Sequence, residues 1–499
     1  MKPLRRGEAT ILSRRLSGAV DAVSLFAALH AEGRAELFFR RTGGTALILV
    51  DHALELEATR GDAAIQAVSE NGTALLGPIA ELLETRPDGD RLGLRFERSD
   101  DPDETVRAAA SSALDTLRAM TTAIRIHDKD EPYAIAALGV IGFDHVDMVE
   151  TLPARPAGDF PDLYFRLAET LVVVEPSGAA RVLALVAGHD DAVTAHRLQS
   201  LGVERLSRTV ARIEQAQIPR LEDAPDVAVD PDIDDARFEA IVERLKEHIF
   251  SGDIFQAVPS RTFEAPCTAP IQAFRRLVKA DPSAYNFYAD TPHGTLFGAS
   301  PENGVEVRGR VVSVSPIAGT RPRGDTGDAD DRQEADLRLD HKEVSEHLML
   351  VDLGRNDIAR VATPGSRRVT SLLRVERFAK VMHLVSTVEG ELDEGRDAID
   401  AIRACLNVGT LSGAPKLKAI ELIRSVETRA RGPYGGAIGV LTGAGNFDSA
   451  VVIRSALVRD GVAEVRAGAG VVADSDPAAE AAETRAKASA VLSALGAAA

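Results

Sequence analysis

Residues 466–487 read Arg466-Ala-Gly-Ala-Gly-Val-Val-Ala-Asp-Ser-Asp-Pro-Ala-Ala-Glu-Ala-Ala-Glu-Thr-Arg-Ala-Lys487. The run Val462 to Ala467 predicts a strand, and Asp476-Pro477 predicts the start of a helix, because aspartate caps helices and proline is tolerated in the first turn. The helix would carry Glu480 and Glu483 three residues apart, which puts both carboxylates on one face. Carboxylates also suit the positive end of a helix dipole, so a purely structural reason for them exists.

Two glycines, Gly468 and Gly470, lie between that strand and that helix. The run resembles a fragment of a dinucleotide loop, but it lacks the third glycine of that motif and the helix that follows at once. Because glycine lets the backbone approach another group closely, we interpret Gly468-Ala-Gly470 as a tight backbone approach to a ligand.

A second glutamate pair lies in Asp340-His-Lys-Glu-Val-Ser-Glu-His-Leu-Met-Leu-Val-Asp-Leu-Gly-Arg-Asn-Asp357. A helix here presents Glu343 and Glu346 on one face. Like charges this close repel each other unless a cation lies between them. Two such pairs could converge on one Mg²⁺, which prefers oxygen ligands and often combines a few protein carboxylates with substrate oxygens. The pairs indicate a metal site for an anionic substrate; the alternative is two solvated helix faces.

Two further clusters carry candidate chemistry. Val381-Met-His-Leu-Val-Ser386 places His383 in an apolar strand, where an imidazole is more often a hydrogen-bonded core residue than a catalyst. Gly409-Thr-Leu-Ser-Gly-Ala-Pro-Lys416 is superficially similar to a phosphate loop, but Walker A requires Gly-Lys-Ser/Thr and here a proline precedes the lysine.

The composition disfavours several classes of protein. The 499 residues include 58 Lys and Arg against 76 Asp and Glu, and this net charge of −18 disfavours nucleic-acid binding. No apolar run approaches the ~20 residues that span a bilayer, and the basic first seven residues lack the apolar core of a secretory signal. The two cysteines, Cys267 and Cys405, exclude a disulfide scaffold and fit a reducing compartment. We therefore expect a cytoplasmic protein without nucleic-acid or membrane partners.

The chain divides near residue 216. Residues 1–215 mix apolar runs with helical stretches, including an Ala-rich helix expected over residues 104–120. Residues 216–236, rich in proline and aspartate, are the best candidate for a linker or crossover. Residues 237–499 mix strands and helices in an order that indicates an α+β fold rather than a regular βαβ winding.

The motifs together resemble those of the chorismate-utilising enzymes. The most similar members are the large subunits of anthranilate synthase and their secondary-metabolism relatives, the 2-amino-2-deoxyisochorismate (2-amino-4-deoxychorismate) synthases. Besides the clusters above, the matching stretches are Gly252-Asp-Ile-Phe-Gln-Ala-Val-Pro-Ser-Arg261, Phe297-Gly-Ala-Ser-Pro-Glu302, Pro316-Ile-Ala-Gly-Thr-Arg-Pro-Arg-Gly324, Arg431-Gly-Pro-Tyr-Gly-Gly-Ala-Ile-Gly439 and Val452-Ile-Arg-Ser-Ala456. The resemblance implies a large composite chorismate-binding fold of antiparallel-rich sheets with flanking helices. Residues 1–215 would form its N-terminal region and residues 237–499 its catalytic region.

The resemblance also implies a metal site. Glu346 and Glu483 would bind Mg²⁺ directly, and Glu343 and Glu480 would support them through water or from behind. The metal would bind the ring carboxylate of chorismate.

The other carboxylate of chorismate belongs to its enolpyruvyl group. The resemblance assigns it to Tyr434, Arg454 and Lys487, together with backbone amides near Gly468 and Gly470. An arginine suits this role because it can bind a carboxylate with two parallel hydrogen bonds.

Three residues would act on the ring. Thr410 would border it, and Glu302 would be the general acid for the leaving 4-hydroxyl group. A general acid must be protonated, so burial should raise the pKa of Glu302. His383 would be the base or an electrostatic partner.

Gln256 bears on the choice of nucleophile. Family members that add water resemble one another in having a lysine base at this position, and glutamine cannot deprotonate water. Ammonia needs no such activation, so Gln256 favours amination at C2. Amination at C4 is a lesser alternative, because members of that subgroup resemble one another in a catalytic lysine where this chain has Thr410.

The ammonia requires a source. A glutamine amidotransferase needs a nucleophilic cysteine with a histidine, and neither cysteine here fits. A separate glutaminase subunit is therefore expected, or the use of free ammonia, and we expect an oligomer.

This chain departs from the family pattern at the regulatory site. Tryptophan-inhibited members resemble one another in a Leu-Leu-Glu-Ser element, where this chain has Arg40 and Arg41 in place of the glutamate and serine. A second element, usually Asn-Pro-Ser-Pro-Tyr-Met, reads Asp281-Pro-Ser-Ala-Tyr-Asn286. A cation facing the ammonium group of tryptophan is repulsive, so we expect no inhibition by tryptophan.

Loss of tryptophan control suggests a role in secondary metabolism such as antibiotic synthesis. We therefore expect release of 2-amino-2-deoxyisochorismate, with full conversion to anthranilate and pyruvate as the alternative that His383 permits. A third possibility, a ligand-binding protein without activity, is disfavoured because the whole set of acidic residues and His383 is present.

Overall fold

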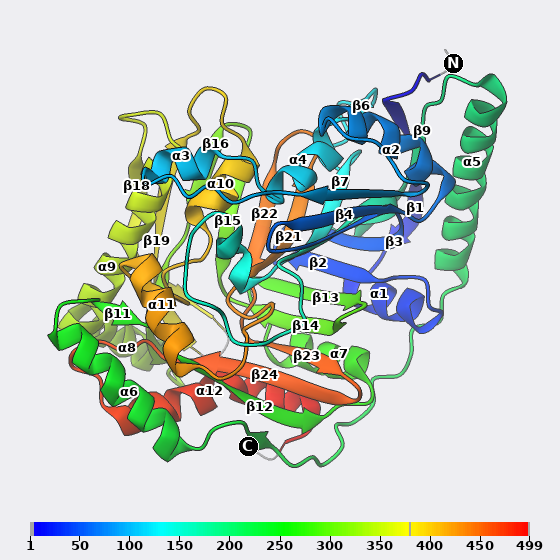
Figure 1. The fold of residues 1–499 in the computed structure, drawn as a ribbon. Coiled ribbons are helices and arrows are strands. Elements are labelled where there is room, and N and C mark those ends of the chain that lie inside the picture. Colours follow the sequence, from blue (N-terminus) through cyan, green and yellow to red (C-terminus); the bar gives the residue numbers. More distant parts are fainter. Residues whose placement is uncertain (1–3, 379–380, 498–499) are drawn as a thin grey trace.

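A large, mostly antiparallel β-sheet runs through the computed structural model, which describes residues 4–378 and 381–497 (Figure 1). Among the named strands of these residues, every ladder except β1–β6 is antiparallel. The strands of the first part of the chain are β1 (Glu8–Ala19), β2 (Leu37–Arg41), β3 (Ala46–Thr59), β4 (Asp62–Ala67), β5 (Arg91–Arg95), β6 (Arg125–Ile126), β7 (Ala136–Ile141), β8 (Leu163–Val174) and β9 (Ala179–Ala187).

The later strands complete the same sheet, apart from β11 and β20, which form a small two-stranded sheet of their own. They are β10 (Asp230–Pro231), β11 (Gln256–Ala257), β12 (Ser260–Pro266), β13 (Tyr285–Thr291), β14 (Gly294–Ser300), β15 (Asn303–Arg308), β16 (Val311–Val314), β17 (Ile317–Pro322), β18 (Arg368–Arg377), β19 (Val381–Glu391), β20 (Gly413–Ala414), β21 (Ala437–Thr442), β22 (Phe447–Val451), β23 (Ser455–Arg459) and β24 (Val462–Gly468).

The sheet has two arms that diverge from β8. One arm continues through β3, β2, β13, β14, β23 and β24 to β12. The other continues through β7, β21, β22, β15 and β16 to β19. The α+β class and the antiparallel-rich sheets expected from the sequence are thereby confirmed.

A shared apolar core joins the two arms. Leu49 and Phe287 from the first arm pack in one cluster with Leu138 and Val440 from the second, and all four side chains are fully or almost fully buried. Two sheets that pack face to face form their core from inward-facing apolar side chains of both sheets. The connection from β14 to β15 therefore passes from one arm to the other, and it carries Glu302.

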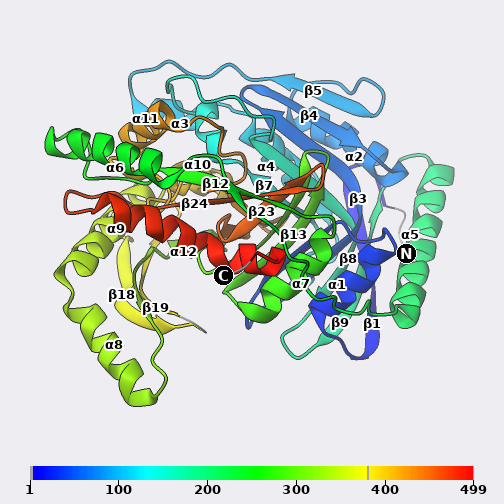
Figure 2. The same cartoon turned by 90° about the horizontal axis from the view of Figure 1, so that it is seen from below.

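Helices cover the outer faces of both arms (Figure 2). α12 and α7 lie against β24 and β14, and α9 and α10 lie against β19 and β15. The helices are α1 (Ala22–Ala31), α2 (Glu70–Leu82), α3 (Glu104–Ala109), α4 (Leu114–Thr122), the 3₁₀ helix η1 (Phe143–Met148), α5 (Ala192–Gln215), α6 (Asp235–Phe250), α7 (Pro270–Ala280), α8 (Gly327–Leu339), α9 (His341–Ala359), α10 (Ala398–Cys405), α11 (Lys416–Val426) and α12 (Pro477–Leu495).

The two helices that carry the glutamate pairs begin where the sequence predicts. The Asp476 carboxylate accepts a hydrogen bond from the Ala479 amide at 2.8 Å, and the Asp340 carboxylate accepts one from the Lys342 amide at 2.9 Å. These caps satisfy amides that have no partner inside a helix. α12 ends at Gly496, whose φ of 113° is a conformation that glycine adopts without a Cβ penalty.

The prediction of one Ala-rich helix over residues 104–120 is wrong in one respect, because this stretch forms two helices, α3 and α4. The Ser112 amide donates to the Asp115 carboxylate at 2.7 Å, and this local bond turns the chain before α4. Alanine-rich composition alone could not reveal that competing bond.

The proline-rich segment over 216–236 connects α5 to α6 and contains the short strand β10. Strands from both sides of the segment pair with each other, as β2 does with β13 and β7 with β21. The division into an N-terminal and a catalytic region stays a prediction. In the described part of the chain, no helix is both long and apolar enough to cross a membrane.

Candidate active site

One cavity of about 470 Å³ lies between α9, α12 and the ends of β14, β19 and β24. Its walls contain every residue that the sequence analysis proposed for the site, from segments far apart in the chain. These are Gln256, Glu302, Glu343, Glu346, His383, Thr410, Tyr434, Arg454, Gly468, Gly470, Glu480, Glu483 and Lys487.

The backbone at the end of β24 lies directly against other cavity residues. A Cβ atom on Gly470 would lie 2.7 Å from Nε2 of Gln256 and 3.2 Å from Oε1 of Glu346. A Cβ atom on Gly468 would lie 3.1 Å from the Tyr434 hydroxyl. The absence of side chains here keeps the backbone exposed to the cavity, as the interpretation of Gly468-Ala-Gly470 requires.

Glu346 is the most perturbed of the four glutamates. Burial raises its pKa to about 7, and the negative charges of Glu343 and Glu483 add to the effect. Its Oε1 accepts a hydrogen bond from Gln256 Nε2 at 3.0 Å. Burial also raises the pKa of Glu343, one turn away, although this carboxylate pairs with Arg321 at 3.3 Å.

The two glutamates of α12 differ in their surroundings. Burial alone would raise the pKa of Glu483, but its ion pair with Lys487 at 2.6 Å lowers it. Burial raises the pKa of Glu480, and its Oε2 is a buried oxygen without a hydrogen-bond partner among the described residues.

The donor set fits a divalent cation that is completed by substrate oxygens. Within residues 4–378 and 381–497, no three His, Cys, Asp or Glu side chains converge closely enough to hold a metal by themselves. Mg²⁺, however, commonly uses only one or two carboxylates with water and substrate. Burial is the first cause of the raised pKa values of Glu346 and Glu480, and a divalent cation would supply a positive charge beside these carboxylates.

Glu302 has the environment of a general acid. It is only 5% exposed, and burial raises the pKa of its carboxyl group to about 7. The Thr410 hydroxyl donates to its Oε1 at 2.6 Å and so orients it within the cavity. A carboxyl group with this pKa is substantially protonated at neutral pH.

His383 has the environment of a neutral base. Burial lowers the pKa of its imidazole to about 4, so the ring is uncharged near neutral pH. Its Nδ1 lies 3.1 Å from the Gly319 carbonyl and 3.0 Å from the Thr320 hydroxyl. Because a carbonyl can only accept, Nδ1 carries the hydrogen and Nε2 keeps its lone pair. This geometry favours the base over the electrostatic partner.

Arg454 and Lys487, two basic residues of the cavity, are linked by a hydrogen bond. Arg454 donates from Nη1 to the Lys487 carbonyl at 2.7 Å, which leaves the rest of its guanidinium group for a ligand. Lys487 donates from Nζ to the Gly468 carbonyl at 3.1 Å and pairs with Glu483. The φ of 49° at Arg454 is a strained backbone conformation for a non-glycine residue, of the kind that gathers at functional sites.

The structure adds cavity residues to which the sequence analysis gave no role: Thr320, Lys342 and Arg466. Thr320 contacts His383, and the charge of Lys342 acts on Glu346. Thr320 lies in a quoted motif and Lys342 precedes Glu343, but neither spacing nor residue type could indicate these contacts.

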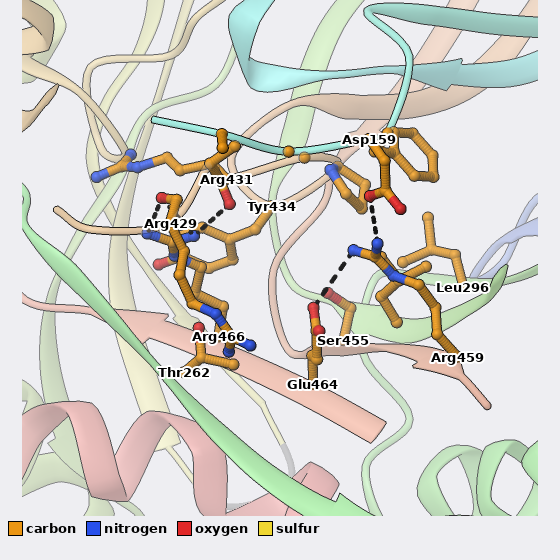
Figure 3. A pocket seen from close by; sticks show the side chains of 17 residues that line it. Asp159, Thr262, Leu296, Arg429, Arg431, Tyr434, Ser455, Arg459, Glu464 and Arg466 are labelled. Atoms are coloured by element: carbon orange, nitrogen blue, oxygen red, sulfur yellow. Dashed lines mark hydrogen bonds and ion pairs between the residues drawn. The ribbon is translucent and has the colours of Figure 1, made fainter. Parts of the chain in front are cut away.

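Arg466 separates the cavity from a second hollow of about 180 Å³ that shares Tyr434 with it. Figure 3 looks into that hollow, where Arg429, Arg431 and Arg466 lie around Tyr434. Arg431 and Arg466 both pair with Glu427 at 2.7 Å, so they build the wall that positions Tyr434.

The chain as a whole matches a known family of enzymes. The family model described as chorismate binding enzyme matches residues 82–493. The chain belongs to the chorismate-binding enzymes.

Three relatives illustrate where it stands in that family. The pyocyanine-specific anthranilate synthase component 1 of Pseudomonas aeruginosa is 43% identical over 473 residues, which cover 90% of this chain and 87% of the relative. The anthranilate synthase component 1 of Vibrio cholerae is 41% identical, over 97% and 96% of the two chains. That of Escherichia coli is 40% identical, over 98% and 95%. This chorismate-binding enzyme is thus similar to anthranilate synthase components over nearly its whole length.

Solved structures agree on the architecture. The anthranilate synthase component I of Streptococcus pneumoniae superimposes with a TM-score of 0.72 at 30% identity, over 91% of this chain and 92% of the other. The menaquinone-specific isochorismate synthase of Escherichia coli gives a TM-score of 0.70 at 17% identity, over 99% and 96%, and shares the fold. The family membership and fold expected from the sequence are therefore confirmed.

Proposed function

We propose that this chorismate-binding enzyme is an anthranilate synthase component I, which converts chorismate and ammonia into anthranilate, pyruvate and water. The observation that carries the proposal is that one cavity contains both a protonated Glu302 and a neutral His383. The names of the relatives also support anthranilate as the product, rather than the aminated intermediate that the sequence analysis placed first.

Glu302 would act in the first step. Ammonia forms a bond to C2, the ring double bonds shift, and the bond between C4 and its oxygen breaks. The Glu302 proton goes to that oxygen, which leaves as water. A carboxyl group with a pKa of about 7 holds this proton at neutral pH yet releases it readily.

His383 would act in the second step. Its free Nε2 removes the proton from C2 of the aminated intermediate, which breaks the bond between C3 and the enolpyruvyl oxygen. The enolpyruvyl group leaves and takes up a proton on its methylene carbon as pyruvate, and the ring becomes aromatic. The lowered pKa of His383 keeps the imidazole ready to accept this proton.

The remaining residues bind chorismate. Arg454 and Lys487 would pair with the enolpyruvyl carboxylate, and Tyr434 would donate to it, since burial raises its pKa and keeps the phenol protonated. Glu346 and Glu483 would hold Mg²⁺, with Glu343 and Glu480 in support. When bound, Mg²⁺ supplies a positive charge for the ring carboxylate.

Gln256 would favour ammonia over water. Its Nε2 donates to Glu346, so its amide is held in the cavity, and a glutamine cannot deprotonate water. Thr410 donates to Glu302, and no lysine stands at this position to act as a nucleophile. This arrangement fits amination at C2, and amination at C4 stays the lesser alternative.

We propose that the ammonia comes from a separate glutamine amidotransferase subunit, because relatives carry the name of a first component. Both cysteines are buried, and burial raises their pKa values, which is opposite to what a thiol nucleophile needs.

A second candidate function is release of 2-amino-2-deoxyisochorismate for secondary metabolism in the cytoplasm. The observation that favours it concerns Arg40 and Asn286, which both depart from the pattern of the tryptophan-inhibited members. In the structure Arg40 donates from Nε to Asn286 Oδ1 at 3.1 Å. One relative is named as pyocyanine specific, which fits a role outside tryptophan supply.

One experiment separates these functions. The protein is incubated with chorismate, Mg²⁺ and an ammonium salt, and the products are identified by mass spectrometry. Anthranilate with free pyruvate supports the first proposal. A product that keeps the enolpyruvyl group supports the second, and no consumption of chorismate would leave a binding protein only.

A further inference from the structure

A second buried histidine lies next to a residue of the catalytic cavity without lining the cavity itself. His347 follows Glu346 on α9, and its side chain is fully buried. Glu346 lines the cavity, whereas His347 lies on a face of the helix that packs against β19 (Figure 2). Neither step of the proposed reaction uses this imidazole.

The imidazole of His347 reaches the strand that carries His383. Its Nε2 lies 2.7 Å from the hydroxyl oxygen of Ser386, which is fully buried on β19, three residues after His383. The Leu373 amide donates to the same hydroxyl oxygen at 2.9 Å. Because an amide can only donate, the Ser386 oxygen accepts there, and its own hydrogen is free to be donated to Nε2 of His347.

The same imidazole also interacts with β17. Burial lowers the pKa of His347 to about 4, and the Ala318 carbonyl on β17 acts in the opposite direction. Nδ1 of His347 is buried without a hydrogen bond of ordinary geometry to any described residue, so Ala318 acts through its carbonyl dipole rather than through a full hydrogen bond. The ring therefore connects α9 to two neighbouring strands.

Ala318 begins a β-bulge in β17 that orients His383. In the pairing with β19, Ala318 lies opposite Leu384. Thr320 lies opposite His383, which leaves Gly319 as an extra residue without a partner. Such a bulge bends the strand and redirects its groups, and the φ of 78° at Gly319 is one that glycine adopts without strain. The Gly319 carbonyl and the Thr320 hydroxyl thereby both reach Nδ1 of His383, at 3.1 Å and 3.0 Å.

Ser386 also holds the beginning of this bulged strand. Its amide donates to the Pro316 carbonyl, just before β17, at 3.2 Å. His347 thus bonds to the residue that fixes β17 at Pro316, and it acts on the carbonyl at which the bulge begins. The direction of His383 Nε2 depends on this arrangement, because a general base must lie within hydrogen-bond reach of the proton that it removes.

We propose that His347 is a positioning residue, which orients His383 through Ser386 and the bulge of β17 for removal of the C2 proton. The inference rests on the proposed function, since it assumes that His383 acts in the second step. His383 has no part in the first step, so loss of this support should slow the elimination of the enolpyruvyl group more than the amination. The aminated intermediate would then leave the cavity before it reacts further.

The first test identifies the product that a variant releases. His347→Leu removes both ring nitrogens and keeps an apolar side chain of moderate size. With chorismate, Mg²⁺ and ammonium salt in excess, anthranilate formation should fall by about 10²-fold, the loss expected for a catalytic group displaced by about 1 Å. Chorismate consumption should fall far less, and its KM should stay near that of the unaltered protein. Mass spectrometry should then show that the product with the enolpyruvyl group exceeds anthranilate.

A double variant shows whether His347 acts through His383. The elimination rate is measured from the isolated aminated intermediate. His347→Leu should lower this rate in the unaltered protein but not further in His383→Ala, because residues that act as a unit are not additive. A merely structural role would lower the rate by the same factor in both backgrounds.

Two further variants probe the same contact. Ser386→Ala removes it from the side of β19 by a smaller truncation and should shift the products in the same direction. His347→Gln keeps an acceptor near the place of Nε2 and should restore part of the elimination. Leu348→Gln is the matched control, since this side chain lies next on α9 but is 42% exposed, and it should leave the products unchanged.

Circular dichroism checks that each variant folds, and Ser386→Ala decides the question if His347→Leu does not. An unchanged ratio of the two products in the folded variants would overturn the proposal. An equal fall of amination and elimination would overturn it too, because His347 would then support the cavity as a whole. An unaltered protein that makes no anthranilate with ammonium would instead refute the proposed function, so the two failures are distinguishable.

Discussion

At the level of single residues, burial favours the neutral form of two catalytic candidates that line one cavity. The same desolvation raises the pKa of the Glu302 carboxyl group and lowers that of the His383 imidazole, because in both cases it disfavours the charged form. The result is a neutral acid and a neutral base on the walls of one cavity, which is the combination that sequential protonation and deprotonation of a ring require.

The pH dependence of kcat/KM follows from these two values. Activity needs Glu302 protonated, so it should fall as the pH rises through about 7. Activity needs His383 neutral, so it should fall as the pH decreases through about 4. A profile measured with ammonium in excess, corrected for the ionisation of ammonia itself, checks both limbs; a rate that increases steadily above pH 8 would contradict the role of Glu302.

Glu302→Gln should remove the acid while keeping a hydrogen-bond acceptor for Thr410. We expect kcat to fall by about 10²–10⁴-fold with little change in chorismate binding, because general acid catalysis contributes that much. Steady-state kinetics and a binding titration measure the two effects. A variant with normal kcat would assign the proton to another group.

Gly470→Ala should damage the metal-binding end of the site. The added methyl group would lie 2.7 Å from Gln256 and displace it or Glu346, so affinity for Mg²⁺ should fall by about 10–100-fold, as for other supporting contacts. Mg²⁺ titrations of activity provide the measurement. Gly93→Ala is the control, since a Cβ atom there meets nothing within 4 Å, and equal effects in both variants would argue against a specific contact.

At the level of secondary-structure elements, strand pairing brings two distant departures from the family pattern together. β2 pairs with β13 so that Arg40 lies opposite Asn286 and Arg41 opposite Tyr285. Arg40 bonds to Asn286, and Arg41 pairs with Glu306 at 2.7 Å. The sequence analysis predicted each departure separately, but only the register of the two strands shows that the replacements contact each other.

Tryptophan should therefore not bind here. The Arg40 guanidinium group would repel the ammonium group of the amino acid, and its bond to Asn286 holds it at this position. Isothermal titration calorimetry with tryptophan should show no heat of binding, with chorismate and Mg²⁺ as the positive control on the same preparation. Micromolar binding of tryptophan would refute the prediction.

At the level of the whole molecule, a buried charge cluster holds the loop after α11 against β24. Glu427 pairs with Arg431 and with Arg466, and it accepts from the Ser260 hydroxyl at 2.7 Å. Burial would raise the pKa of Glu427, but the two guanidinium groups lower it. The carboxylate therefore contributes stability above its unfolded pKa, and this contribution is lost as the pH falls through the folded value.

Glu427→Gln should lower the free energy of unfolding by about 3–5 kcal/mol, because it leaves two buried cations without their partner. Denaturant unfolding followed by circular dichroism measures the loss. Glu421→Gln is the control, since its partner Lys418 is exposed, and it should change stability by less than about 0.5 kcal/mol. Comparable effects of the two substitutions would show that the buried cluster has no special role.

The sequence by itself determined the helix starts at Asp340 and Asp476 and the α+β class, and it predicted the residues that the structure gathers in one cavity. It could do so because caps, side-chain periodicity and motif residues are local properties of the chain. Only the tertiary structure decided the break between α3 and α4, the pairing of Arg40 with Asn286, and the pKa values of Glu302 and His383. These depend on which distant segments exclude water from a group and which partners they bring to it, and that information exists only once the two arms of the sheet and the helices α9 and α12 have packed together.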